Sequence, residues 1–157
     1  IRTPESTTAM IVFDPHQHPE TSVIITCYNQ GRFLADAIKS VLNQTVHNFE
    51  IMVVDDGSSD NTKDVAAGFA EVRYVYQTNS GLSAARNTGI DRSRGRYLVF
   101  LDADDWLYRN ALETNLDYLK RNPDHAFVSG WHDKVDEWNY PIATDEQNVV
   151  AKAHYRH

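Results

Sequence analysis

Residues 22–43 have the sequence SVIITCYNQGRFLADAIKSVLN, which joins a β-branched run to an apolar pattern of helical period. The run at residues 22–26 has the composition of a buried strand, and the CYNQG segment that follows is a turn. Apolar residues then recur at three- and four-residue spacing across residues 32–43, which predicts an amphipathic helix. The stretch therefore predicts one strand–turn–helix unit.

Strand-length apolar runs alternate with helical patterns along the rest of the chain. Further strands are predicted at residues 50–54, 72–77, 96–101 and 125–135, and further helices at 65–70 (with Asp60 as N-cap), 82–93 and 106–122. Such alternation is typical of an α/β protein with a Rossmann-like, mostly parallel sheet flanked by helices. We expect a leader or linker over residues 1–20, with a short strand at 10–13, and one domain over residues 21–157.

The composition excludes several classes of protein. The chain of 157 residues is 41% hydrophobic and has a net charge of −7, which argues against nucleic-acid binding through bulk electrostatics. Its single cysteine, Cys27, permits no internal disulfide and is expected to be a small buried residue at a strand end. No apolar run reaches the length of a membrane span, so we expect a cytoplasmic protein, which could still work at a membrane surface.

Polar side chains follow three of the predicted strands. They are Thr26, Tyr28 and Asn29 after the first strand, Asp55 and Asp56 after the second, and Asp102, Asp104 and Asp105 after the fourth. In parallel α/β sheets, ligands bind beyond the carboxyl ends of the strands. The coincidence predicts a binding site built from these three segments.

The three carboxylates of Asp102, Asp104 and Asp105 repel one another unless a cation neutralises them. Mg²⁺ and Mn²⁺ prefer hard oxygen ligands, and Mg²⁺ typically takes one or two carboxylates together with water and substrate phosphates. The cluster therefore favours a divalent metal site. As an alternative for one of the three, Asp102 or Asp105 can cap the next helix.

Two other segments each have a functional and a structural interpretation. The Asp55–Asp56 pair suits recognition of a base or a sugar, because carboxylates accept N–H and O–H donors, and it equally suits a turn. Arg86 lies one turn into a predicted helix, where it can meet a phosphate or remain a solvated surface residue. The sequence has neither a Gly-x-Gly-x-x-Gly motif nor a P-loop motif.

Four stretches together resemble the family 2 glycosyltransferases, which are nucleotide-sugar enzymes of the GT-A fold. They are TSVIITCYNQGRFLADAIKSVLNQT, FEIMVVDDGSSDNT, NSGLSAARNTGI and GRYLVFLDADD, and the match covers about residues 21–123. The resemblance implies a metal-dependent, inverting transfer of sugar from a nucleotide-diphosphosugar, first of all a UDP-sugar. The implied cofactor is Mn²⁺ or Mg²⁺, and the acceptor is an unidentified glycan, lipid or protein.

The resemblance also implies a set of site residues. The nucleotide-binding residues would be Thr26, Tyr28, Asn29, Asp56, Arg86 and Asp102, and the metal ligands would be Asp104, Asp102 and Asp105. Tyr28 would pack on the base, and Asp56 would accept its N–H. Asp104 would be the first metal ligand, with Asp102 reaching the ribose or, through water, the metal.

The family's general base has no match in this chain. Carboxylates in the stretch after the acidic cluster include Asp133, Asp136, Glu137, Asp145 and Glu146. None lies in a segment similar to that of the base, so we expect the base and the acceptor-binding half to lie beyond the chain end. Two alternatives stay open: a nucleotidyltransferase, which the glycine-poor CYNQGR loop disfavours, and a non-catalytic module that binds nucleotide-sugars.

Overall fold

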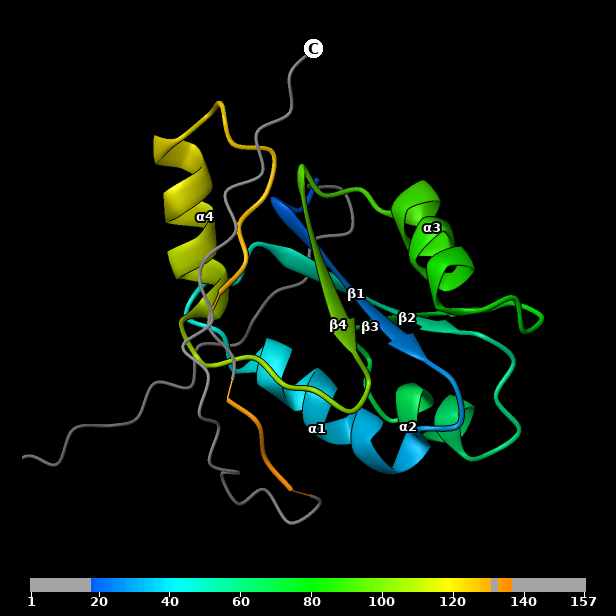
Figure 1. Ribbon diagram of the computed structural model, residues 1–157. Helices are drawn as coiled ribbons and strands as arrows, with labels where there is room; N and C mark the ends of the chain where they lie inside the picture. Colours follow the sequence, from blue (N-terminus) through cyan, green and yellow to red (C-terminus); the bar gives the residue numbers. More distant parts are fainter. Residues whose placement is uncertain (1–17, 131–132, 137–157) are drawn as a thin grey trace, which may run out of the picture.

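The computed structural model describes residues 18–130 and 133–136. In this part of the chain, strands and helices alternate without exception (Figure 1). The elements are β1 (Thr21–Cys27), α1 (Gly31–Leu42), β2 (Phe49–Asp55), α2 (Thr62–Ala67), β3 (Val72–Tyr76), α3 (Leu82–Arg92), β4 (Tyr97–Asp102) and α4 (Ala111–Arg121). None of these helices combines the length and the apolar character needed to cross a bilayer.

The four strands form one parallel sheet in the order β3-β2-β1-β4. The predicted α/β, Rossmann-like fold is therefore confirmed. The order reverses at β1, which pairs with β2 on one side and with β4 on the other. Thr26 pairs with Asp102 across β1 and β4, and Cys27 pairs with Asp55 across β1 and β2. The register thus brings the predicted polar segments together at one edge of the sheet.

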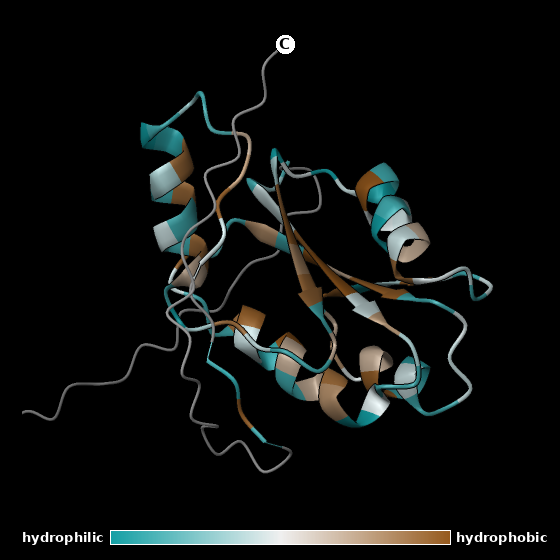
Figure 2. Ribbon diagram, viewed as in Figure 1, coloured by the Kyte–Doolittle hydropathy of each residue, from teal (hydrophilic) through white to brown (hydrophobic). Residues whose placement is uncertain are grey.

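Alternating residues of β1 and β2 fill two separate apolar layers. Val23 and Ile25 face the larger layer, which α1 covers with its side chains Leu34 and Ile38. Ile24 faces the smaller layer with Met52, on the side covered by α3. Figure 1 shows α1 and α2 on one face of the sheet and α3 on the other, and Figure 2 shows the apolar central strands between them. Because both faces are covered, the middle residues of the central strands, 23–25 and 51–54, are all apolar.

Helix α3 approaches the sheet closely through Gly89. A Cβ atom at this position would lie 2.3 Å from Cγ2 of Ile24, which is fully buried. Only a residue without a side chain lets the helix pack at this distance. The close packing fixes the position of the α3 N-terminus, which borders the pocket described below.

Three expectations from the sequence are wrong at the C-terminal side and in α2. Helix α4 begins at Ala111 rather than at residue 106, because the backbone of residues 107–109 bonds to α1 and the turn after it. Residues 125–130 form no strand, and Val135 makes only an isolated bridge. Helix α2 has Asn61, not Asp60, as its N-cap and ends at Ala67. The predicted strand at residues 10–13 lies outside the described residues.

A buried carboxylate anchors the amino-terminal edge of the sheet. Glu50 is 1% exposed and accepts hydrogen bonds from the Ser22 hydroxyl at 2.6 Å and the Arg94 backbone N–H at 2.7 Å. The Arg94 guanidinium lies 2.9 Å from the same carboxylate. Burial by itself raises the pKa of Glu50, but the hydrogen bonds from Ser22 and Arg94 outweigh it, so the pKa lies below its ordinary value of 4.5.

This anchor predicts a pH-dependent contribution to stability. A carboxyl group whose pKa is lower in the folded state stabilises the fold above its unfolded pKa, and that stabilisation is lost as the pH falls through the folded pKa. At pH 7, Glu50→Gln should lower the free energy of unfolding by about 2–3 kcal/mol, because hydrogen bonds to a charged group are lost. Below about pH 4.5, the difference from wild type should shrink.

Urea unfolding at pH 7 and at pH 3.5 measures the effect. The control is Glu71→Gln, which changes an exposed carboxylate before β3 and should alter stability little at either pH. A Glu50→Gln penalty that is equal at both pH values would contradict the interpretation.

Candidate functional site

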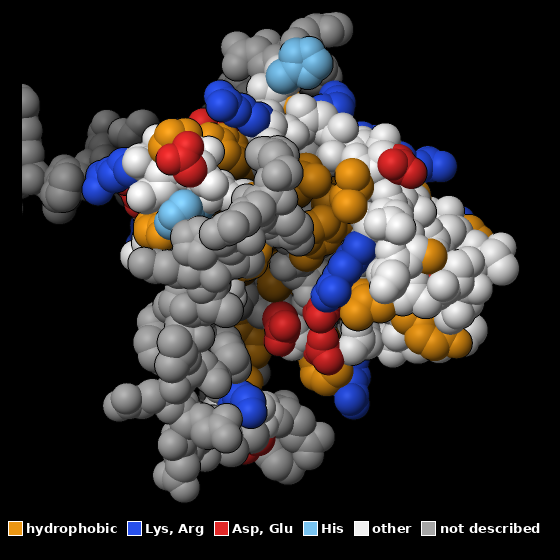
Figure 3. Space-filling model, turned by 45° about the horizontal axis from the view of Figure 1, so that its top comes forward, with side chains coloured by type: hydrophobic (Ala, Val, Ile, Leu, Met, Phe, Trp, Pro, Cys, Tyr) orange, Lys and Arg blue, Asp and Glu red, His pale blue; other side chains and the backbone are white. Residues whose placement is uncertain are grey.

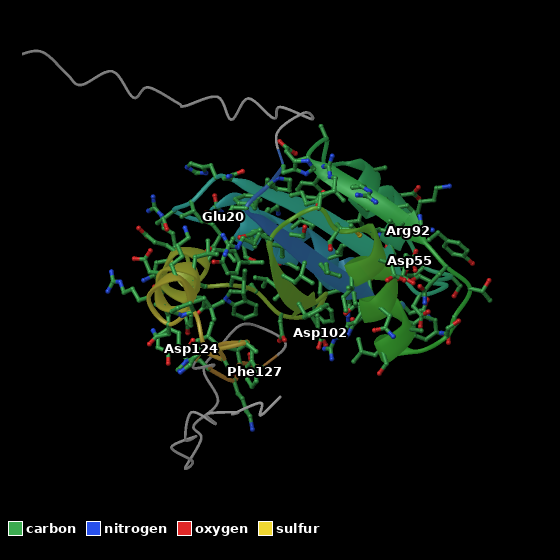
Figure 4. The ribbon with its side chains drawn as sticks, turned by 90° about the horizontal axis from the view of Figure 1, so that it is seen from above. Glu20, Asp55, Arg92, Asp102, Asp124 and Phe127 are labelled. Atoms are coloured by element: carbon green, nitrogen blue, oxygen red, sulfur yellow. The ribbon has the colours of Figure 1, made fainter. Side chains whose placement is uncertain are left out.

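A pocket of about 460 Å³ opens beyond the carboxyl ends of β1, β2 and β4. Its lining comes from the ends of these strands, the turn before α3 and the first turns of that helix. The lining residues are Thr26, Cys27, Tyr28, Gln30, Asp56, Asn79, Gly81, Leu82, Ala85, Asp102 and Asp104. Figure 4 shows the labelled Asp55 and Asp102 toward this edge of the sheet and Glu20 at the opposite edge. The pocket lies at the point where the strand order reverses, the usual ligand site of such sheets.

Asp102, the last residue of β4, is held by two neighbours. Thr26 Oγ1 donates a hydrogen bond to its Oδ1 at 3.0 Å, and an Arg86 Nη donates to the same oxygen at 3.1 Å. Both charged side chains are about 39% exposed, so the ion pair is partly solvated. Arg86 therefore neutralises Asp102 from α3, although it does not itself line the pocket.

Asp104 differs from Asp102 in having no such partner. Its side chain is exposed and lines the pocket, and it makes no ion pair or hydrogen bond with any other residue that the structure describes. Figure 3 shows acidic side chains grouped beside a basic one on this face of the molecule. Among the described residues, nothing occupies the Asp104 carboxylate, whereas Asp102 is already hydrogen-bonded to Thr26 and Arg86.

Neither Asp102 nor Asp105 caps α4, because that helix begins at Ala111 with Asn110 as its N-cap. The structural alternative for the acidic cluster is therefore removed. Asp105 is exposed, does not line the pocket, and donates its backbone N–H to the Asp102 carbonyl at 3.0 Å.

Asp56 lies at the opposite wall and fixes the turn before α3. Its Oδ1 accepts from Gln77 Nε2 at 2.7 Å and from the Ser80 N–H at 2.8 Å, and its Oδ2 accepts from the Gly81 N–H at 2.8 Å. The residue is only 4% exposed, yet it lines the pocket. It thus combines a structural role in the turn with a carboxylate edge toward a ligand.

Tyr28 and Asn29 have different places despite being neighbours. Tyr28 is 51% exposed and lines the pocket, so its ring is available as a platform for a flat group. Asn29 does not line the pocket. It has a φ of 54° and accepts the Ser59 N–H at 2.8 Å, which braces the loop after β2.

Neither Asp55, which does not line the pocket, nor Cys27, which does, has the properties of a catalytic group. Asp55 accepts the Ser58 N–H at 2.8 Å and the Tyr74 hydroxyl at 2.5 Å, and burial together with this bond raises the pKa of Tyr74. Cys27 is 2% exposed, as predicted, and burial raises the pKa of its thiol, which disfavours the nucleophilic thiolate.

Sequence patterns missed the side chain that fixes the loop after the acidic cluster. Gln44 is 2% exposed, its Nε2 donates to the Tyr108 carbonyl at 2.8 Å, and its Oε1 accepts the Leu112 N–H at 3.0 Å. This loop, residues 103–110, is thereby attached to the end of α1. Trp106, in the same loop, is 42% exposed. The burial of this amide is visible only in the structure, so no sequence pattern pointed to the contact.

The residues present fit a divalent cation at the level of donor chemistry. Three carboxylates line the pocket, and two of them, Asp102 and Asp104, lie at the end of β4 and in the loop after it. No group of three or more histidine, cysteine, aspartate or glutamate side chains suited to a metal occurs in the described ranges 18–130 and 133–136. Mg²⁺ and Mn²⁺ sites at nucleotide phosphates commonly use one or two carboxylates. The donor set therefore suits a cation that shares its coordination with a phosphate ligand.

Comparison with known proteins points to one family. The model described as "Glycosyl transferase family 2" matches residues 22–156. An uncharacterized glycosyltransferase of Rickettsia conorii is 42% identical over 119 residues, which are 74% of this chain and 20% of the relative. An uncharacterized glycosyltransferase of Escherichia coli, YibD, is 40% identical over 118 residues, or 68% of this chain and 34% of the relative. The chain thus spans about a fifth to a third of these relatives.

Two solved structures share the fold. S. aureus TarS in complex with UDP-GlcNAc has a TM-score of 0.64 and 25% identity, over 68% of this chain and 32% of that one. The mannosyltransferase PcManGT from Pyrobaculum calidifontis, in complex with GDP-Man and Mn²⁺, has a TM-score of 0.59 and 27% identity, over 68% of this chain and 34% of that one. Both similarities extend over about a third of the solved chain.

Proposed function

The chain belongs to glycosyl transferase family 2, and we propose that it binds a nucleotide-diphosphosugar for transfer of the sugar to an acceptor hydroxyl. The observation that carries the proposal is the pocket at the strand-order reversal. It combines an exposed aromatic ring, a buried carboxylate and a carboxylate without a partner among the described residues. The ring and the buried carboxylate suit a nucleobase, and the available carboxylate suits a cation that links it to a diphosphate. A UDP-sugar is the proposed donor, as in the TarS complex.

We assign the base to the side of the pocket formed by Tyr28 and Asp56. Tyr28 offers a ring face for stacking, and Asp56 offers a buried acceptor for a base N–H. Asp102, held by Thr26 and Arg86, lies farther along the same pocket and suits a ribose hydroxyl. Asn29 contributes by bracing the loop after β2 rather than by touching the ligand.

The proposed cofactor is Mn²⁺ or Mg²⁺, held by Asp104 with Asp102 and Asp105 as further candidate ligands. When bound, the cation supplies Lewis-acid stabilisation of the charge on the departing diphosphate. The contribution of the chain itself is to hold the base and the diphosphate end of the donor in a fixed relation, because binding groups on β1, β2 and β4 converge on one pocket.

We further propose that the transfer inverts the anomeric configuration, with a carboxylate as general base for the acceptor hydroxyl. Asp133, the first candidate carboxylate after the acidic cluster, accepts a hydrogen bond from the Tyr108 hydroxyl in the described part of the chain. Neither Asp133 nor Tyr108 lines the pocket. We place the base in a part of the whole protein other than this pocket.

Calorimetric titration of the chain with UDP tests the proposal. We expect saturable binding in the presence of Mn²⁺ and much weaker binding when the metal is removed with EDTA, because the cation links the diphosphate to Asp104. Titration with uridine, which lacks the diphosphate, should show weak binding that does not depend on Mn²⁺. Absence of UDP binding under both conditions would overturn the proposed function.

A further inference from the structure

A hydrogen-bonded relay behind the pocket wall joins α3 to the end of β2. The Thr88 hydroxyl on α3 donates to Gln77 Oε1 at 2.6 Å, and Gln77 Nε2 donates to Asp56 Oδ1 at 2.7 Å. Gln77 follows β3 directly, and its own backbone N–H donates to the Asp55 carbonyl at 2.9 Å. Thr88 and Gln77 are both half-buried, and neither lines the pocket.

The chemistry of the three groups fixes the direction of the relay. An ionised carboxylate only accepts hydrogen bonds, so the NH₂ side of the Gln77 amide must face Asp56. The amide oxygen then faces Thr88, whose hydroxyl satisfies it as a donor. Flipping the amide would place its oxygen against the Asp56 carboxylate, and the relay therefore has one favourable arrangement.

Gln77 also determines which part of Asp56 is left for a ligand. An ionised carboxylate has about four lone-pair positions. On Oδ1, Gln77 and the Ser80 N–H take both positions, whereas on Oδ2 the Gly81 N–H takes one. Asp56 thus offers a single acceptor position, on Oδ2, to a molecule in the pocket that it lines.

We propose that Gln77 is a positioning residue that sets the base preference of the pocket, an inference that rests on the proposed function. Uracil presents one ring N–H between two carbonyl groups and needs one acceptor. Guanine presents two adjacent donors, the ring N–H and the exocyclic NH₂, and pairs best with both oxygens of one carboxylate. With Oδ1 saturated, Asp56 favours uracil over guanine.

The central test compares the affinities of UDP and GDP, each with Mn²⁺, in wild type and in Gln77→Leu. Loss of the amide releases Oδ1 from the bond that holds it behind the pocket wall, so the Asp56 carboxylate can turn and offer both oxygens to the pocket. The ratio of the GDP dissociation constant to the UDP dissociation constant should then fall about tenfold or more. A general loss of fold or of metal binding would weaken both nucleotides equally and leave this ratio unchanged. If wild type binds UDP and folded Gln77→Leu has the same ratio as wild type, this inference is overturned and the proposed function is left intact.

A second variant tests the relay even if Gln77→Leu folds poorly. Gln77→Glu keeps the shape of the side chain, and its protonated form can donate to Asp56 as the amide does. Between pH 8 and pH 5.5, its UDP affinity relative to wild type should therefore rise as the pH falls, because deprotonation sets two carboxylates against each other. The control Thr78→Glu adds the same charge at an exposed position outside the relay and should show no such rise.

The remaining outcomes also decide between the claims. A relative affinity of Gln77→Glu that does not change with pH would contradict the relay. Failure of wild type to bind either UDP or GDP would overturn the proposed function and the base preference with it.

Discussion

Asp104→Ala is expected to abolish the Mn²⁺-dependent part of UDP binding. Asp104 lines the pocket and has no ion pair or hydrogen bond within the described segments, so its carboxylate is available to a cation. Asp102, by contrast, already receives hydrogen bonds from Thr26 and Arg86. Loss of a direct metal ligand should weaken metal-dependent binding by on the order of 100-fold or more, since even outer-shell changes cost about 10–100-fold.

Calorimetry with and without Mn²⁺ measures this loss directly. Because the Asp104 side chain is exposed and does not support the core, the melting temperature of Asp104→Ala should match that of wild type. Asp124→Ala is the matched control, since Asp124 is also exposed and lies near the end of α4, away from the Asp102 edge in Figure 4. Metal-dependent UDP binding that survives in Asp104→Ala would remove Asp104 from the cation site.

Asp105→Ala separates the two candidate ligands of the loop. Asp105 does not line the pocket, although the sequence makes it a candidate second ligand. A loss of metal dependence in Asp105→Ala as large as that in Asp104→Ala would show that the loop rearranges around the cation.

Asp56→Asn should have the second large effect, on both affinity and stability. The carboxylate accepts three hydrogen bonds, from the side chain of Gln77 and from the backbone of Ser80 and Gly81. An amide has only one acceptor group, so its NH₂ must face a donor on one side or the other. We expect a loss of about 1.5–3 kcal/mol for a charged hydrogen bond, which corresponds to roughly 10–150-fold in UDP affinity.

The matched control is Asp55→Asn, the same change one residue earlier on the same strand end. Asp55 bonds to Ser58 and Tyr74 and does not line the pocket. Thermal unfolding should show that both variants are less stable than wild type. Titration with UDP at a temperature where both are folded should show a large loss only for Asp56→Asn, and equal losses would contradict the assignment of the base to Asp56.

Local patterns predicted most of the fold because the central elements bury apolar side chains at regular spacing. The segment at residues 22–43 forms β1 and α1 within one residue of the expected bounds. Parallel pairing then required that strand ends meet at one edge, which is why Thr26 and Asp102 could be expected near each other. The pocket followed from topology rather than from any single motif.

The start of α4 could not be predicted because its cause is nonlocal. Leu107 and Tyr108 continue an apolar pattern, but the Leu107 N–H bonds to the Ser40 hydroxyl at 3.0 Å and the Tyr108 carbonyl accepts from Gln44. These bonds to α1 replace a first helical turn. Nothing in the local sequence shows that a side chain more than 60 residues away takes these backbone groups.

The polar residues behind the site were missed for a related reason. Gln77 lies next to a predicted strand and Thr88 lies within a predicted helix, and neither position is unusual for its residue type. Their roles arise only when α3 packs near the sheet through Gly89. Glu50 had a sequence signal, because a charge within the apolar run FEIMVV must find partners when the strand is buried.

A crystal of the chain grown with UDP and Mn²⁺, measured near the manganese absorption edge, tests the central claim most directly. The account predicts one anomalous peak in the pocket, within coordination distance of an Asp104 carboxylate oxygen and of the UDP diphosphate. UDP bound in the pocket with no manganese peak, or with the peak away from the loop that carries Asp104, would contradict it.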